Sequence, residues 1–153
     1  MKKKTSRIWM TGLVLAALCG AAYAQFAKPE DAVRYRKAVM QVLAHHFSAV
    51  GAAVQGKIPF NKETFKHDAD VVHLTSGLPW EAFQVPGSDK GDTTLKSSAL
   101  QEKENFLSLA EQLQTNTAKL AQMAAAGDID GAKAQFGQVA QSCKACHGAY
   151  RKK

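Results

Sequence analysis

The stretch that decides the fold is 127-GDIDGAKAQFGQVAQSCKACHGAY-150, close to the end of the chain. Its apolar residues recur three and four positions apart without interruption, which is the spacing of one face of an α-helix. They are Ile129, Ala132, Phe136, Val139, Cys143, Cys146 and Tyr150. Gly127 favours the end of a preceding helix, and Asp128 favours the start of the next. So short a connection favours antiparallel helices that pack at shallow angles in a bundle.

Three further helices are predicted upstream. The first begins at Pro29, where a proline and two following acids suit a first turn, and ends near Gly56. The second runs from a cap at Asn61 to about Gly77, and the third starts between Thr94 and Ser98 and ends at Gly127. The apolar face of the first helix contains Val33, Met40, Leu43, Phe47, Val50 and Val54.

The long connection from Gly77 to Asp92 is rich in glycine and proline. We expect its aromatic residues, Trp80 and Phe83, to pack on the core. No stretch shows sustained strand alternation. The sequence therefore predicts an all-α protein, an antiparallel up-and-down four-helix bundle.

The first 24 residues have the pattern of a cleaved signal peptide. Basic residues at positions 2–4 and 7 precede an apolar run from Ile8 to about Ala22, and Ala22-Tyr23-Ala24 suits cleavage after Ala24. A membrane anchor is the alternative, but the run is shorter than the roughly 20 residues that span a bilayer. We expect export, with residues 25–153 as one mature domain that has no membrane segment.

Composition argues against several functional classes. The predicted signal carries four of the 20 basic residues, which leaves 16 against 13 acidic residues, a net charge of +3. This balance gives no reason to expect nucleic-acid binding. No nucleophile–base pair or pair of acids stands out, so no enzymatic role is expected.

The mature chain contains two cysteines, Cys143 and Cys146, followed directly by His147. A disulfide between helical positions three apart would close almost no loop and add little stability. A structural zinc site needs four ligands, and this motif offers three. The spacing C-x-x-C-H instead predicts a heme held covalently by both cysteines, with the imidazole of His147 binding the iron. A heme-free module that uses its thiols for a metal is the competing hypothesis.

The group on the other face of the iron decides the function of a heme protein. His45, His46, His67 and His73 are each expected to have surface roles, and Met123 is expected to fill the core. Met40 lies on the apolar face of the first helix, one turn after Arg36. Arg36 and Lys37 could contact the heme propionates. Met40 would then either bind the iron or only pack over it.

Three segments of the chain resemble cytochrome c′, the class II c-type cytochromes. They are 25-QFAKPEDAVRYRKAVM-40, 78-LPWEAF-83 followed by Gly91-Asp92, and 143-CKACHGAYRKK-153. The resemblance implies a periplasmic homodimer with one heme c per chain in the bundle core, covalently bound through Cys143 and Cys146, with His147 as the axial iron ligand. It further implies that Arg36, Lys37 and Asp92 contact the heme or its propionates. Arg151 would lie near the proximal histidine and influence NO binding there.

For function, the resemblance implies a five-coordinate, high-spin heme that binds NO or CO, with possible electron transfer to an unknown partner. The alternative is a low-spin electron carrier in which Met40 is the sixth ligand. The high-spin interpretation is the one that the 34-RYR-36 and 78-LPWEAF-83 segments favour.

Overall fold

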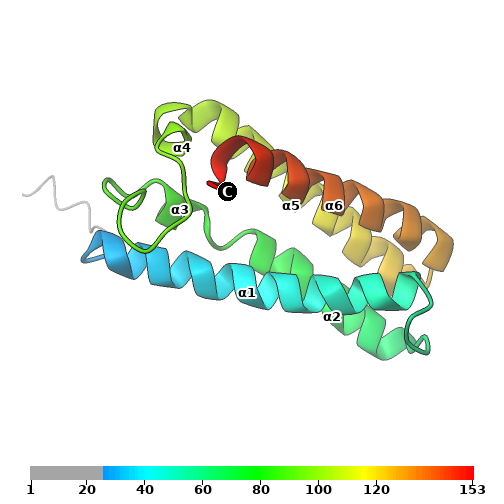
Figure 1. Cartoon of the computed structure of the whole chain (residues 1–153). Coiled ribbons are helices and arrows are strands. Elements are labelled where there is room, and N and C mark those ends of the chain that lie inside the picture. Colours follow the sequence, from blue (N-terminus) through cyan, green and yellow to red (C-terminus); the bar gives the residue numbers. More distant parts are fainter. Residues whose placement is uncertain (1–25) are drawn as a thin grey trace, which may run out of the picture.

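The computed structural model describes residues 26–153, and its four long helices form an antiparallel up-and-down bundle (Figure 1). The elements are α1 (Pro29–Val54), α2 (Lys62–Ser76), α3 (Trp80–Phe83), α4 (Ser98–Gln101), α5 (Lys103–Ala126) and α6 (Ile129–Tyr150). The predicted fold class is confirmed. The predicted signal peptide, residues 1–24, lies outside the described residues. Within 26–153, no helix is both long enough and apolar enough to cross a membrane.

The helix ends follow the capping residues that the sequence places there. The Asn61 side chain accepts a hydrogen bond from the Thr64 amide at 2.9 Å, and the Asp128 side chain accepts one from the Gly131 amide at 2.9 Å. Each satisfies one of the amides that lack a partner in a first helical turn. Gly127 ends α5 with a φ of 75°, a left-handed conformation that glycine adopts without a Cβ clash.

The predicted third helix is wrong in one respect, because the structure divides it into α4 and α5. The break lies at Glu102, whose φ of −104° and ψ of 48° are not helical. The Glu102 carboxylate accepts a hydrogen bond from the Tyr150 hydroxyl at 3.0 Å, a tertiary contact that local sequence does not reveal. In the structure the long connection between α2 and α4 comprises residues 77–97, and it contains the short helix α3, which was not predicted.

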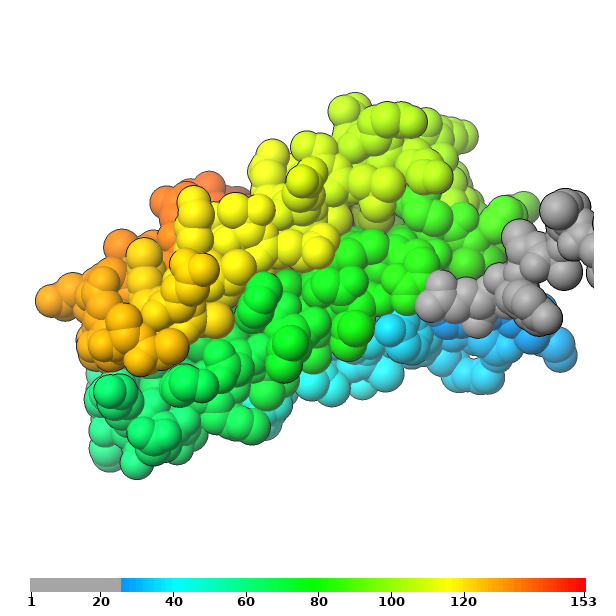
Figure 2. All heavy atoms as spheres, turned by 180° about the vertical axis from the view of Figure 1, so that it is seen from behind, coloured from blue at the N-terminus to red at the C-terminus, as the bar shows by residue number. Residues whose placement is uncertain are grey.

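The main core lies between the four long helices. Its buried members are Val50, Val54, Phe65, Ala69, Leu113, Leu120, Ala124, Ala132 and Val139, and Met123 packs against them as predicted. Helices α2 and α5 lie side by side on the face seen in Figure 2. Between them, the hydroxyls of Ser76 and Thr117 are 2.9 Å apart and fully buried.

Helices α1 and α6 approach closely at one place. A Cβ on Gly51 would lie 2.9 Å from Cζ of Phe136, so only glycine lets the two helices come this close. The Phe136 ring stacks on Phe47 with centroids 4.5 Å apart. Beyond this contact, toward the C-terminus of α6, the space between the helices contains a cavity.

Candidate functional site

One wall of the cavity is the last two turns of α6, which carry Cys143, Cys146 and His147. Both thiols are free and half-buried. Helical spacing of three and four residues places all three side chains on one side of α6, toward α1. The spacing of three and four residues that packs α6 into the bundle thus also turns the cysteine motif toward the cavity.

The thiols are held in the neutral form. Burial raises the pKa of Cys143. Burial, together with the neighbouring Cys143, raises the pKa of Cys146 to about 11. Across residues 26–153, neither cysteine belongs to a group of histidines, cysteines and carboxylates close enough to hold a metal ion. The arrangement therefore disfavours a zinc site at the motif.

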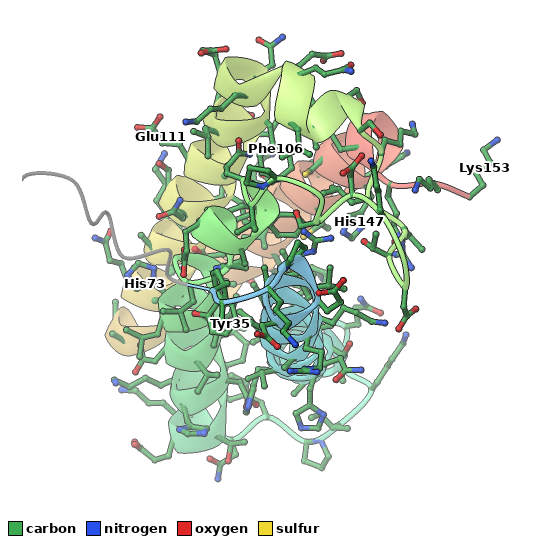
Figure 3. All side chains as sticks on the ribbon, turned by 90° about the vertical axis from the view of Figure 1, so that its left-hand side faces the viewer. Tyr35, His73, Phe106, Glu111, His147 and Lys153 are labelled. Atoms are coloured by element: carbon green, nitrogen blue, oxygen red, sulfur yellow. The ribbon has the colours of Figure 1, made fainter. Side chains whose placement is uncertain are left out.

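His147 lies one turn before the end of α6, at the cavity wall. Partial burial lowers the pKa of its imidazole, and the positive charge of Arg151 lowers it further. Both effects favour the neutral ring, which is the form that binds a metal. In Figure 3, His147 and Phe106 lie on the side of the bundle where α5 and α6 run, whereas His73 lies beside α2.

The cavity has a volume of about 650 Å³, within the usual range for the site of a cofactor or small ligand. Helix α1 forms the wall opposite α6, and α5 and the connection close the remaining sides. Most of the surface is apolar and comes from side chains that include Leu43, Phe47, Trp80, Phe83, Phe106, Leu109 and Leu113. An apolar slot of this size, with two cysteines on one wall, suits a large flat ring attached through sulfur.

All eight residues predicted for the site line this one cavity. They are Arg36, Lys37, Met40, Asp92, Cys143, Cys146, His147 and Arg151. Met40 is half-buried on the α1 wall. His45, His46, His67 and His73 do not line it, so His147 is the one imidazole among its lining residues.

Arg36 is held differently from the expectation. Its side chain is buried, and its two terminal nitrogens donate hydrogen bonds to the Ala82 carbonyl, the Ser88 hydroxyl and carbonyl, and the Thr93 hydroxyl. The guanidinium also lies 4.7 Å from the centroid of the Phe83 ring, a cation–π contact. Burial lowers the pKa of Arg36 to about 10, so the group stays charged at neutral pH. Its main task in this structure is to bind the connection to α1.

Lys37 and Asp92 meet at the rim of the cavity. Lys37 Nζ lies 2.7 Å from Asp92 Oδ2, and this hydrogen bond, with the charge of Lys37, lowers the pKa of the Asp92 carboxyl. Both side chains are at least half exposed. Such a pair contributes little stability, but it places an ammonium group at the cavity edge.

Two backbone hydrogen bonds hold the chain after the cysteine motif against the connection. The Lys96 amide donates to the Tyr150 carbonyl at 2.8 Å, and the Lys152 amide donates to the Thr94 carbonyl at 2.7 Å. Between these two bonds, Leu95 and Arg151 form an antiparallel bridge. This pairing sets the position of Arg151 beside the cavity.

Several lining residues were not identified from the sequence. Phe106 and Tyr150 belong to helical apolar patterns, which could have pointed to the cavity, and their rings meet edge to face at 5.3 Å. Thr93 and Leu95 lie in a segment without periodicity, so no sequence signal marked them. They reach the site only because the connection folds back across it.

Comparisons with known proteins agree with this geometry. The family model for cytochrome c′ matches residues 31–151. Cytochrome c′ of Alcaligenes xylosoxydans is 42% identical over 129 residues, covering 84% of this chain and 99% of that protein. Cytochrome c′ of Rubrivivax gelatinosus is 35% identical over 130 residues, covering 84% of this chain and 100% of the relative.

Solved structures extend the likeness to three dimensions. Cytochrome c′ from Shewanella frigidimarina superposes with a TM-score of 0.81 at 39% identity, covering 84% of this chain and 99% of that one. A nitric oxide complex of a variant from Alcaligenes xylosoxidans gives 0.78 at 40% identity, with coverage of 84% and 99%. The match runs through the cysteine motif and through all four long helices. This chain therefore belongs to the cytochrome c′ family, and its cofactor is heme c.

Proposed function

We propose that this protein is a periplasmic gas-binding cytochrome with a five-coordinate, high-spin heme that takes NO or CO. The observation that carries the proposal is the composition of the cavity. His147 is the one imidazole among the lining residues, most of the cavity surface is apolar, and the α1 wall contributes Met40, Leu43 and Phe47 to it. Structures of relatives from Alcaligenes xylosoxidans with bound NO and CO support it.

Each site residue has a role in this proposal. Cys143 and Cys146 would hold heme c through thioether bonds, and the imidazole of His147 would bind its iron. Heme iron supplies the position at which a diatomic gas binds. Leu43 and Phe47 exclude water and anions from the α1 side, because a charged ligand would lose its hydration there without a partner.

The polar residues act at the edges of the cavity. Lys37 places a cation at the rim, where a propionate carboxylate would compete with Asp92 for it. Arg36 holds the connection over the cavity and adds a buried positive charge beside it. Arg151 lies next to His147 and influences gas binding on the proximal side. These roles concern ligand binding rather than catalysis.

Met40 distinguishes this function from the alternative, a low-spin electron carrier. Its thioether lines the same cavity as His147, so a sulfur–iron bond is the specific feature that would favour electron transfer. We propose that Met40 only packs over the iron. Visible spectra of the purified protein test this: we expect broad high-spin bands that change on adding NO, and Met40→Leu should keep them. A low-spin parent spectrum that becomes high-spin in Met40→Leu would establish the alternative.

We further propose that the protein is a homodimer. Exposed apolar side chains lie on the neighbouring helices α1 and α2, at Val42 and Leu74, and on the segment that follows α2, at Leu78. Burying such side chains against a second copy would remove them from water. Analytical ultracentrifugation at micromolar concentration should show twice the chain mass; a single monomeric species would rule the dimer out.

A further inference from the structure

A second group of metal-binding side chains lies outside the heme cavity, between α1 and α2. His46 comes from α1, and His67 and Asp68 come from α2. One ligand atom from each residue lies within 4.8 Å of the others. The imidazoles of His46 and His67 have ring centroids 5.7 Å apart and stand nearly edge to face. We name these three residues the imidazole–carboxylate cluster.

Asp68 is the buried member of the cluster. The residue is 8% exposed, and its Oδ1 lies 2.7 Å from Nδ1 of His46. Among the ion pairs formed within residues 26–153, Asp68 has this imidazole as its partner rather than a lysine or arginine. A buried carboxylate is costly unless a cation or hydrogen-bond donors compensate it. The cluster therefore combines a buried carboxyl group with two imidazole rings.

We propose that the imidazole–carboxylate cluster binds one divalent transition-metal cation of the zinc type per chain, with His46, His67 and Asp68 as its ligands. Two imidazole nitrogens and one carboxylate oxygen are a donor set that Zn²⁺ accepts, and water completes a tetrahedral site. Imidazole also separates this class of ion from Mg²⁺, which prefers oxygen ligands.

The distances suit such an ion after small movements. Tetrahedral bonds of about 2.0–2.1 Å place neighbouring ligand atoms about 3.3 Å apart. The contact between His46 and Asp68, at 2.7 Å, is slightly shorter than this, and the cluster as a whole spans no more than 4.8 Å. The His67 side chain is exposed, so its ring can turn toward the other two without disturbing the core.

The cluster is independent of the heme site. None of its three residues lines the heme cavity, whose lining on α6 includes Cys143, Cys146 and His147. In the heme-loaded protein, the thioether bonds and the axial bond occupy the donors on α6. Zinc binding to that form therefore reports on the remaining histidines, whatever the spin state of the iron.

Calorimetric titration of the heme-loaded protein with ZnCl₂ tests the proposal. We expect one zinc ion per chain in the parent and no comparable binding of MgCl₂. His67→Gln and Asp68→Asn should each weaken zinc binding by about tenfold or more, as loss of a ligand or of its anchoring partner does. His73→Gln is the matched control, because it removes a histidine of the same helix that lies outside the cluster; its affinity should stay within about twofold of the parent.

Several results would overturn the proposal. They are the absence of a saturable zinc site in the parent, parental affinity in His67→Gln, a stoichiometry of half an ion per chain, or an equal loss in His73→Gln. His67 is exposed, so its replacement should leave folding and the visible heme spectrum unchanged. If Asp68→Asn does not fold, the His67→Gln titration alone decides between the outcomes.

Discussion

The buried guanidinium of Arg36 makes a sharp prediction about what holds the cavity wall in place. Arg36→Met keeps an unbranched apolar stem but removes the guanidinium and its four hydrogen bonds to the connection. Two of the acceptors that lose their donor are the carbonyls of Ala82 and Ser88, both of which belong to residues that are 0% exposed. The methionine can repack the stem, but it cannot satisfy these oxygens.

The expected loss of unfolding free energy follows from the two carbonyls that no longer have a hydrogen-bond donor. A buried polar group without a partner costs about 1–3 kcal/mol, so the pair costs roughly 2–6 kcal/mol. The hydroxyls of Ser88 and Thr93 can rotate toward other hydrogen-bond partners, so they add little to the loss of unfolding free energy. Water that enters as the connection loosens recovers part of the rest. We therefore expect the free energy of unfolding to fall by about 3–5 kcal/mol, the range for breaking one partner of a buried charged contact.

A neighbouring arginine provides the matched control. Arg34 lies two residues earlier on α1, its side chain is 78% exposed, and its ion pair is with Asp31 one turn away. Arg34→Met should change the free energy of unfolding by no more than about 0.5 kcal/mol. Both variants can be compared with the parent by urea unfolding at pH 7, followed by far-ultraviolet circular dichroism of the heme-loaded protein.

Hydrogen exchange then shows where the loss occurs. In Arg36→Met, the amides of Ser88 and Lys90 should exchange faster through local opening of the connection. Amides in the middle of α5, which open only when the whole bundle unfolds, should lose protection by no more than the fall in the free energy of unfolding. If the two variants differ by less than about 1 kcal/mol, the four hydrogen bonds do not stabilise the connection as argued. Unchanged exchange at Ser88 and Lys90 would also contradict the reasoning.

Three further predictions concern the bundle, the attachment and the pH dependence. Gly51→Ala should lower the free energy of unfolding by about 1–3 kcal/mol, because the new methyl group meets a phenylalanine of α6 at 2.9 Å; urea unfolding measures this. Replacing both Cys143 and Cys146 by alanine should leave a chain from which acidified solvent extracts the heme, whereas intact-mass spectrometry of the parent should show it retained. Burial and the hydrogen bond to Glu102 raise the pKa of Tyr150, so its contribution to stability is complete below its ordinary pKa of about 10 and disappears as pH rises through the raised value. Tyr150→Phe should therefore flatten the decline in the free energy of unfolding above about pH 10.

The cysteine motif shows why the site could be predicted so largely from the sequence. Cys143, Cys146 and His147 share one helix, so regular helical geometry places them on one side without any tertiary information. Arg36, Lys37 and Met40 came from the pattern of the first helix as well as from a resemblance, and Asp92 and Arg151 came from the resemblance alone. All five line the cavity. The contacts that hold Arg36 were not predictable, because its acceptors lie 46 to 57 residues away in a connection that has no periodicity.

The sequence by itself determined the helical bundle, the ends of most helices and the attachment motif on a core-facing stripe. These depend on interactions within a few residues: apolar spacing, capping side chains and a left-handed glycine. The tertiary structure alone decided the break at Glu102, the cavity beyond the contact of Gly51 with α6, and the meeting of His46 with His67 and Asp68. Each of these depends on the register between helices distant in the chain, and side-chain packing across the bundle sets that register.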